Sequence, residues 1–109
     1  MRVVITDAAK LDLVAIGDYI RPDNPQRAGT FVQELLDHCD TLGQMPRRHP
    51  LVFRYERAGI RRAVHGNYLI FYRISLNEDA VEIVHILNGS MDYEPILFAA
   101  TTGQGVQEP

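Results

Sequence analysis

The chain has 109 residues, of which 46% are apolar and 23% are charged, and its formal net charge is −3. This length and composition predict one soluble globular domain that is large enough to bury a core without disulfide staples. The single cysteine, Cys39, excludes an internal disulfide, and no apolar run has the length of a signal peptide or a membrane span, so we expect a cytoplasmic protein without membrane contacts.

The N-terminal residues predict a strand followed by a helix. Residues 2–5 form a short stretch that ends in three β-branched residues, and Thr6 after them is a good helix N-cap. Apolar side chains then recur at helical spacing from Ala9 to Ile20, and Pro22 disfavours helical dihedrals in the residue before it. The pattern therefore predicts an amphipathic helix of three to four turns that ends near Arg21.

A second helix is predicted directly after the first. Asn24 and Pro25 form an N-cap followed by proline at the first helical position, where its missing N–H costs nothing. An apolar stripe that includes Leu35 and Cys39 continues until Gly43. Two helices with so short a connection predict an antiparallel hairpin whose apolar side needs a partner surface.

A basic segment follows the second helix. The stretch from Arg47 to Arg62 contains six of the eleven basic residues and only one acid, Glu56, which gives it a charge of +5 (six minus one). Its basic residues are Arg47, Arg48, Arg54, Arg57, Arg61 and Arg62. Such a patch on an acidic chain favours a specific anionic partner over general nucleic-acid coating, although a merely solvated loop is an equal alternative.

The longest apolar segments predict a three-stranded antiparallel meander over residues 60–65, 68–74 and 81–87. A two-residue turn at Gly66-Asn67 pairs the first two strands. It predicts the register His65 with Tyr68, Ala63 with Ile70 and Arg61 with Tyr72. For the second and third strands we expect Arg73 opposite Glu82 as an ion pair, Phe71 opposite Val84 and Ile70 opposite His85.

This register gives the meander two different faces. The face that we expect to pack on the helices carries Ile60, Val64, Leu69, Phe71, Val84 and Ile86. The face that we expect to be partly open carries Arg61, His65, Tyr68, Tyr72 and His85 among Ala63, Ile70, Ile83 and Leu87. Residues 91–100 predict a short strand or helical turn that closes a domain spanning 1–100. Residues 101–109 predict a disordered tail.

The order of strand, two helices and three strands resembles the RelE/ParE toxin superfamily, and most closely ParE. The resemblance rests on Asp12-Leu13 and Asp18-Tyr19-Ile20 in the first helix, Asn24-Pro25 opening the second, and the strings from Tyr68 to Ile74 and from Val81 to Gly89. It implies an α+β toxin fold and a toxin of a type II toxin–antitoxin pair, silenced by a cognate antitoxin. ParE-like members poison DNA gyrase or act on other targets, and RelE-like members cut messenger RNA on the ribosome.

Two positions depart from the superfamily pattern. Asn88 stands where many relatives have histidine, and Met91 lies in a loop that often carries arginine. RelE-like nucleases also use several lysines and a basic C-terminal segment, whereas the only lysine here is Lys10. We therefore expect a binding toxin without catalytic residues. One alternative is a ribonuclease whose candidate catalytic residues are Arg61, His65, Tyr72 and His85. The other is an inert relic of the fold that still binds an antitoxin.

The site prediction assigns side chains to two partners. Contacts to the target, with DNA gyrase first, are expected from Arg57, Arg61, Arg62, Tyr72 and His85. Contacts to the antitoxin are expected from Arg47, Arg48 and Arg54, because the basic patch would meet an acidic segment of the antitoxin. Leu35 is included because antitoxins of this superfamily bind apolar grooves. The histidines and Cys39 show no ligand pair at zinc-like spacing, so we expect no metal, no cofactor and no sequence-specific nucleic-acid binding.

Overall fold

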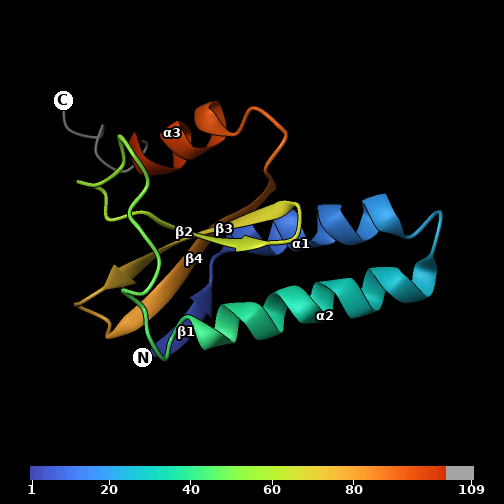
Figure 1. Cartoon of the computed structure of the whole chain (residues 1–109), viewed down its shortest axis with the longest axis horizontal. Helices are drawn as coiled ribbons and strands as arrows, with labels where there is room; N and C mark the ends of the chain where they lie inside the picture. Colours follow the sequence, from blue (N-terminus) through green and yellow to red (C-terminus); the bar gives the residue numbers. More distant parts are fainter. Residues whose placement is uncertain (103–109) are drawn as a thin grey trace.

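The computed structural model describes residues 1–102, which form a four-stranded sheet with three helices (Figure 1). The elements are β1 (Arg2–Ile5), α1 (Asp7–Ile20), α2 (Pro25–Thr41), β2 (Arg61–His65), β3 (Tyr68–Ser75), β4 (Ala80–Asn88) and α3 (Glu94–Thr102). The strand order is β1-β4-β3-β2, with β1 parallel to β4 and the other pairs antiparallel. The predicted α+β fold, a helical hairpin with a mostly antiparallel sheet, is confirmed.

Both predicted helix caps are present. The Thr6 hydroxyl accepts from the Ala9 N–H at 3.3 Å and donates to the Ile83 carbonyl at 2.6 Å, so the cap of α1 is tied to β4. The Asn24 side chain accepts from the Arg27 N–H at 3.0 Å, and Pro25 opens α2. Each cap satisfies a backbone donor that the first turn of a helix leaves free.

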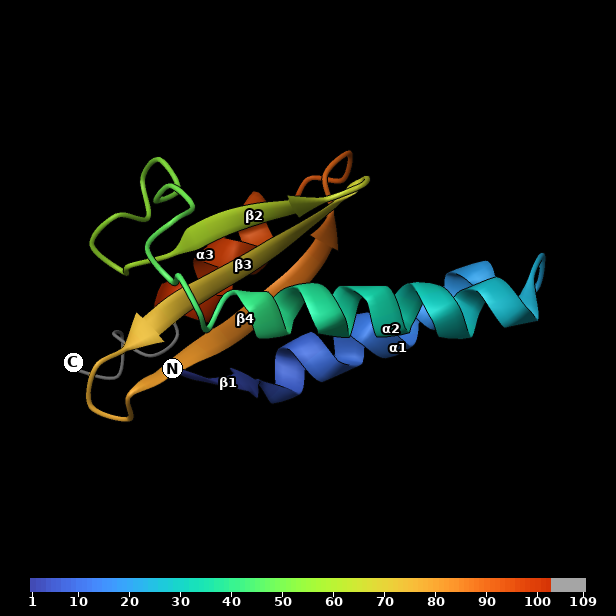
Figure 2. The ribbon, with the colours of Figure 1, turned by 60° about the horizontal axis from the view of Figure 1, so that its bottom comes forward.

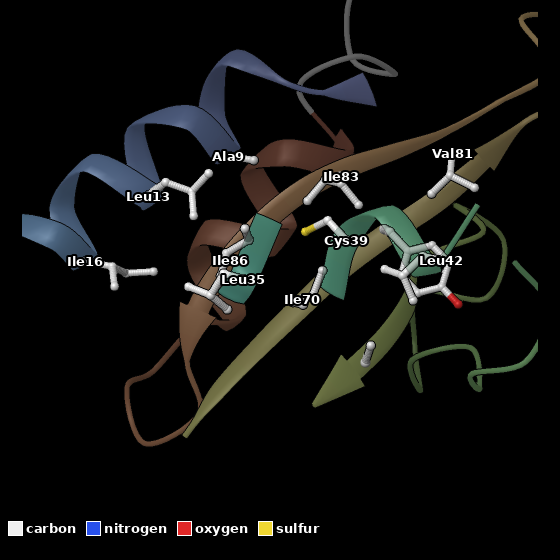
Figure 3. Packing of buried hydrophobic residues seen from close by; sticks show 12 residues of the cluster. Ala9, Leu13, Ile16, Leu35, Cys39, Leu42, Ile70, Val81, Ile83 and Ile86 are labelled. Carbon is white, nitrogen blue, oxygen red and sulfur yellow. The ribbon is translucent and has the colours of Figure 1, made fainter. Parts of the chain in front are cut away.

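The hairpin of α1 and α2 runs along the sheet and extends beyond it (Figure 2). Its apolar stripes meet the sheet in one cluster, in which Leu35 and Cys39 of α2 point inward (Figure 3). The buried members are Ala9, Leu13, Ile16, Leu35, Cys39, Leu42, Ala63, Ile70, Tyr72, Val81, Ile83 and Ile86. Burying one such leucine or isoleucine stabilises the fold by roughly 1.5–3 kcal/mol.

The helices cover the sheet face that we expected to be open. Ala63, Ile70, Tyr72 and Ile83 are buried against α1 and α2. Most of the face expected to meet the helices instead forms a second cluster beneath α3 and the basic loop, and Leu87 joins this cluster from the other predicted face. Val64, predicted on the same face, is 60% exposed. The buried members of the second cluster are Val52, Tyr55, Ile60, Phe71, Val84, Leu87 and Leu97. Other elements pack against both faces of the sheet, so apolar side chains occur on both sides of its strands. The sequence pattern of the strands therefore does not show which face packs against the helical hairpin.

The predicted register is right for β2 and β3 and partly wrong for β3 and β4. The pairs from Arg61 with Tyr72 to His65 with Tyr68 are all present, as is Arg73 opposite Glu82. The register then shifts by one residue between Phe71 and Tyr72 of β3, so Phe71 pairs with His85 and Ile70 with Ile86. This β-bulge leaves Val84 without a direct partner in β3 and moves Ile86 to the helix-facing cluster.

The C-terminal segment is helical. Leu97 of α3 is fully buried, while Phe98 is 60% exposed. Thr101 and Thr102 are the last residues of α3, and the remainder of the predicted tail, 103–109, lies outside the described residues. Across the described part of the chain, no helix combines the length and the apolar character needed to cross a membrane.

Candidate functional site

The basic loop between α2 and β2 is held at its base by two side chains of the sheet. The Tyr72 hydroxyl donates to the Pro46 carbonyl at 2.8 Å, and the Arg61 guanidinium donates to the His49 carbonyl at 2.7 Å. Burial raises the pKa of Tyr72, so its hydroxyl stays a neutral donor. Arg61 and Tyr72, both predicted to contact the target, therefore fix the loop from beneath, and Tyr72 has no exposed surface.

The middle of the loop is anchored by its own apolar residues. Val52 and Tyr55 are buried in the second cluster, and the Tyr55 hydroxyl donates to Glu94 of α3 at 2.8 Å. Burial, reinforced by that carboxylate, raises the pKa of Tyr55. Backbone bonds from Val52 N–H to Ile60 carbonyl and from Arg62 N–H to Pro50 carbonyl close the loop on β2. The loop is thus a fixed surface, although it has no regular secondary structure.

The anchored loop presents four arginines outward. Arg47, Arg48, Arg54 and Arg57 are exposed, whereas Arg61 and Arg62 are only partly exposed. Arg54 has a φ of 78°, in the left-handed region that a non-glycine residue rarely adopts. Its guanidinium carbon lies 5.7 Å from the ring centre of Phe53, which is 76% exposed. A cation beside an exposed aromatic ring is typical of a binding surface.

Two pockets flank Arg54, and we call the surface around them the arginine surface. The first, of about 590 Å³, lies between the loop and α3 and is lined by Arg54, Tyr55, Arg57, Ala58, Glu94, Pro95, Phe98, Thr101 and Thr102. The second, of about 600 Å³, is lined by Pro50, Leu51, Val52, Phe53, Arg54, Arg62, Tyr93 and Glu94. The arginines were predicted as binding residues from the sequence, whereas Phe53, Phe98 and the place of α3 beside them were not. An isolated exposed aromatic residue has no periodic pattern, and the contact of α3 with the loop forms only in the folded chain.

A second surface lies on α1, away from the core. Leu11 is 70% exposed and Tyr19 is 79% exposed, and Val14 between them is exposed as well. Tyr19 also borders a smaller pocket of about 280 Å³, which Met91 and the end of β4 help to line. We call Leu11, Val14 and Tyr19 the α1 apolar strip. Val14 lies beside the groove between α1 and α2, and Tyr19 lies beside the end of β4. Exposed apolar side chains on a helix are typical of a protein-binding site.

The other predicted site residues have structural partners. Nδ1 of His85 lies 2.8 Å from Oδ2 of Asp12, and the pair is largely buried. Nδ1 of His65 contacts Nδ1 of His38 in α2. The side chains of the ribonuclease alternative, Arg61, His65, Tyr72 and His85, are thus each held by a different partner, and the described structure does not assemble them into an acid–base pair around one position.

Leu35 was predicted to contact the antitoxin, but in the folded chain it is not accessible to a partner. Its side chain has no exposed surface and packs between α2 and the sheet. Replacing such a side chain by a carboxylate would destabilise the core. Weaker antitoxin binding by such a variant would therefore result from unfolding and not from a lost contact. The exposed apolar residues of the hairpin are those of the α1 apolar strip.

The two departures from the superfamily pattern have local roles. The Asn88 side-chain oxygen accepts from both the backbone N–H and the hydroxyl of Ser90, at 2.8 and 2.7 Å, and so closes the turn after β4. Met91 is 41% exposed and lines the pocket beside Tyr19. Neither residue belongs to the arginine surface.

Comparison with solved structures places this fold among toxin–antitoxin proteins. A chain of the chromosomal ParDE toxin–antitoxin system from P. aeruginosa superposes with a TM-score of 0.69 and 22% sequence identity, over 81% of this chain and 95% of that chain. A chain of the RelBE2 toxin–antitoxin complex from Mycobacterium tuberculosis superposes with a TM-score of 0.60 and 25% identity, over 80% of this chain and 95% of that chain.

Two comparisons at the level of sequence gave different results. A comparison with curated protein sequences gives no match. The family model described as ParE toxin of type II toxin–antitoxin systems, parDE, matches residues 3–93. That range runs from β1 to the segment before α3 and includes the helical hairpin, the basic loop and the whole meander. The chain therefore belongs to the ParE toxin family of type II toxin–antitoxin systems.

Proposed function

We propose that this toxin inhibits growth by binding a protein target, with DNA gyrase as the first candidate, and that a cognate antitoxin neutralises it. The observation that carries the proposal is the arginine surface, where three arginines and two exposed phenylalanines surround two pockets on a fixed loop. Arginine and aromatic residues dominate the binding energy of protein interfaces. The resemblance to ParE toxins supplies gyrase as the target to test.

Binding is favoured over catalysis because the candidate acid–base groups are already engaged. RNA cleavage without a metal needs a base and an acid at one phosphate, together with cations. His85 contacts Asp12, and the buried Tyr72 donates to a backbone carbonyl and has a raised pKa. A binding toxin needs no such pair.

The target surface that we propose consists of Arg54, Arg57 and Arg62. Arg54 joins this group because it stands between the two pockets, with Arg57 beside one and Arg62 beside the other. Arg61 and Tyr72 support the loop and are left out. The guanidinium groups would meet carboxylates of the target, and Phe53 and Phe98 would supply apolar contact area.

The antitoxin surface that we propose combines the α1 apolar strip with Arg47 and Arg48. The structural neighbours were solved as parts of toxin–antitoxin systems, which supports a protein partner for this chain too. An amphipathic antitoxin segment would cover Leu11, Val14 and Tyr19 with its apolar side. Acidic residues of the same antitoxin would meet the exposed arginines at the start of the basic loop.

The proposal is tested with purified gyrase, DNA and the refolded or antitoxin-free toxin. We expect the toxin to inhibit supercoiling and to stabilise gyrase–DNA cleavage complexes. Arg54→Glu with Arg57→Glu should weaken this inhibition by more than about tenfold, because both arginines are exposed and would lose their contacts to the target.

The matched control changes charge by the same amount elsewhere. Arg2 and Arg21 are exposed and lie outside the loop, and their ion pairs, with Glu78 and Asp18, are exposed as well, so Arg2→Glu with Arg21→Glu should leave inhibition unchanged. Equal loss in both double variants would show that net charge and not the arginine surface matters. A wild-type toxin that arrests growth in cells and leaves gyrase untouched would exclude gyrase as the target.

The RelE-like ribonuclease is the second candidate, and the 25% identity to the RelBE2 chain favours its inclusion. If the toxin is such a ribonuclease, its induction should cause rapid cleavage of ribosome-bound messages, and the His85→Ala variant should not cleave them. The binding proposal predicts intact bulk messenger RNA at early times and growth inhibition by His85→Ala close to that of the wild type. Mapping of message ends after induction separates the two.

A further inference from the structure

Two histidines that are far apart in sequence meet between α2 and β2. Nδ1 of His38 lies 2.9 Å from Nδ1 of His65, and their ring centres are 5.1 Å apart. Both side chains are half-buried. The sequence shows no zinc-like spacing here because 27 residues separate the pair, and the contact exists only once α2 packs on the sheet.

We propose that His38 and His65 form a two-histidine site for a transition-metal cation, with Cu²⁺ bound more tightly than Zn²⁺. Metal–imidazole distances of about 2.0–2.1 Å place two ligand nitrogens about 2.9 Å apart at a 90° angle and about 3.4 Å apart at the tetrahedral angle. The separation of 2.9 Å matches the 90° arrangement. That angle belongs to square-planar and tetragonal sites, which are typical of Cu²⁺ and Ni²⁺.

The two rings present their Nδ1 atoms to each other. A cation between them would bind the lone pair of each neutral imidazole nitrogen.

The surroundings are partly apolar, and among the described residues no third His, Cys, Asp or Glu joins the pair as a possible ligand. The ring of Phe31 lies 5.7 Å from that of His65, and Phe31 also contacts Tyr68. Glu34 is one helical turn before His38, and the Arg27 guanidinium donates to both of its carboxylate oxygens, at 2.6 and 3.1 Å. The charged and titratable groups near the pair are therefore Glu34, Arg27 and His49. Water would fill the remaining coordination positions.

A cation in this position would join α2 to the end of β2. The two ligands come together only in the folded chain, so metal binding would stabilise the fold and raise the melting temperature with metal concentration. This inference is independent of whether the toxin binds gyrase or cuts RNA.

The test is a titration of the whole purified chain with CuCl₂, ZnCl₂ and MgCl₂ in a non-chelating buffer. We expect one Cu²⁺ per chain, an electron paramagnetic resonance spectrum with two nitrogen ligands, weaker binding of Zn²⁺ and none of Mg²⁺. His38→Gln and His65→Gln should each weaken Cu²⁺ binding by at least about tenfold. His85→Gln is the matched control, because His85 pairs with Asp12 and not with the two histidines, and it should bind like the wild type.

A second experiment needs no variant and therefore tests the proposal even if a variant misfolds. The wild-type chain is titrated with Zn²⁺, and the imidazole signals are followed by nuclear magnetic resonance. The shifts should be confined to His38 and His65. Unchanged Cu²⁺ affinity in folded His38→Gln, shifts centred on other histidines, or no saturable binding would each overturn the proposal. The last result would leave the pair as a hydrogen bond between two rings.

Discussion

Among single residues, Asp12 has the clearest structural role, because it completes the free edge of β4. The strand β1 pairs with β4 only as far as Ile5 opposite Ile83. Beyond that point Oδ2 of Asp12 accepts from the Ile86 N–H at 2.8 Å and lies 2.8 Å from Nδ1 of His85. One side chain of α1 thus replaces the missing strand at this position.

We predict that Asp12→Ala lowers the free energy of unfolding by roughly 1–3 kcal/mol, since it leaves part-buried donors without an acceptor. Asp12→Asn should cost less because its amide oxygen still accepts one hydrogen bond. Urea denaturation measures both variants. Equal stabilities for Asp12→Ala and the wild type would mean that water satisfies the edge of β4.

The buried thiol of Cys39 predicts a dependence of stability on alkaline pH. Burial raises its pKa from 9.0 to about 12, so the unfolded chain loses the proton first as the pH rises. The contribution of the thiol is complete below pH 9 and falls by about 1.4 kcal/mol per pH unit between 9 and 12. The difference in unfolding free energy between the wild type and Cys39→Ala, measured across this range, should therefore shrink as pH rises. A constant difference would show that the thiol ionises equally in both states.

Among the elements, the contact between the end of α2 and β1 depends on a glycine. The N-terminal amine of Met1 donates to the Gly43 carbonyl at 2.8 Å. A Cβ atom at position 43 would collide with the carbonyl oxygen of Met1 and would lie 2.9 Å from a methyl group of Val3. The backbone of β1 can approach α2 this closely only because residue 43 has no side chain.

We predict that Gly43→Ala displaces β1 from α2 and destabilises the chain by about 1–3 kcal/mol, which is typical of overpacking. Gly29→Ala is the matched control, because a Cβ there meets nothing and lies on a helix that alanine favours. Thermal melts of both variants test this difference. A Gly43→Ala melting temperature equal to that of the control would place the N-terminus away from α2.

The elements also show which predictions the sequence supports. Turn and cap residues determine structure locally, so Thr6, Asn24-Pro25 and Gly66-Asn67 predicted two helix starts and one hairpin register correctly. The bulge at Val84 has no such marker, because β4 is apolar on both sides and fits either register. The faces of the sheet were exchanged for the same reason.

Across the whole molecule, the sequence predicted which arginines cluster, but it did not predict which of them support the loop and which are exposed for binding. Charge clustering from Arg47 to Arg62 is visible in the sequence, because like charges this dense are unusual on an acidic chain. Whether one arginine supports the loop, as Arg61 does, or lies exposed, as Arg57 does, depends on carbonyl groups that only the folded loop presents. Exposed apolar residues on α1 likewise become a strip only after the other side of the helix is buried.

The two surfaces predict two kinds of effect on binding of the cognate antitoxin. Long-range attraction to exposed charges acts mainly on the association rate and is screened by salt, over about 10 Å at 0.1 M. Contacts of the α1 apolar strip act after docking and set the dissociation rate. We therefore expect Arg47→Gln with Arg48→Gln to slow association at low salt and to match the wild type at high salt. Tyr19→Ser should speed dissociation at every salt concentration.

Surface plasmon resonance with captured antitoxin, at a series of salt concentrations, separates the two rates. Arg2→Gln with Arg21→Gln provides the charge-matched control, since both arginines lie outside the basic loop and their ion pairs, with Glu78 and Asp18, are exposed. An association rate that does not change with salt for the wild-type toxin would remove Arg47 and Arg48 from the antitoxin surface. A dissociation rate that Tyr19→Ser leaves unchanged would remove the α1 apolar strip, because an aromatic side chain with 79% of its surface exposed has no core packing to lose.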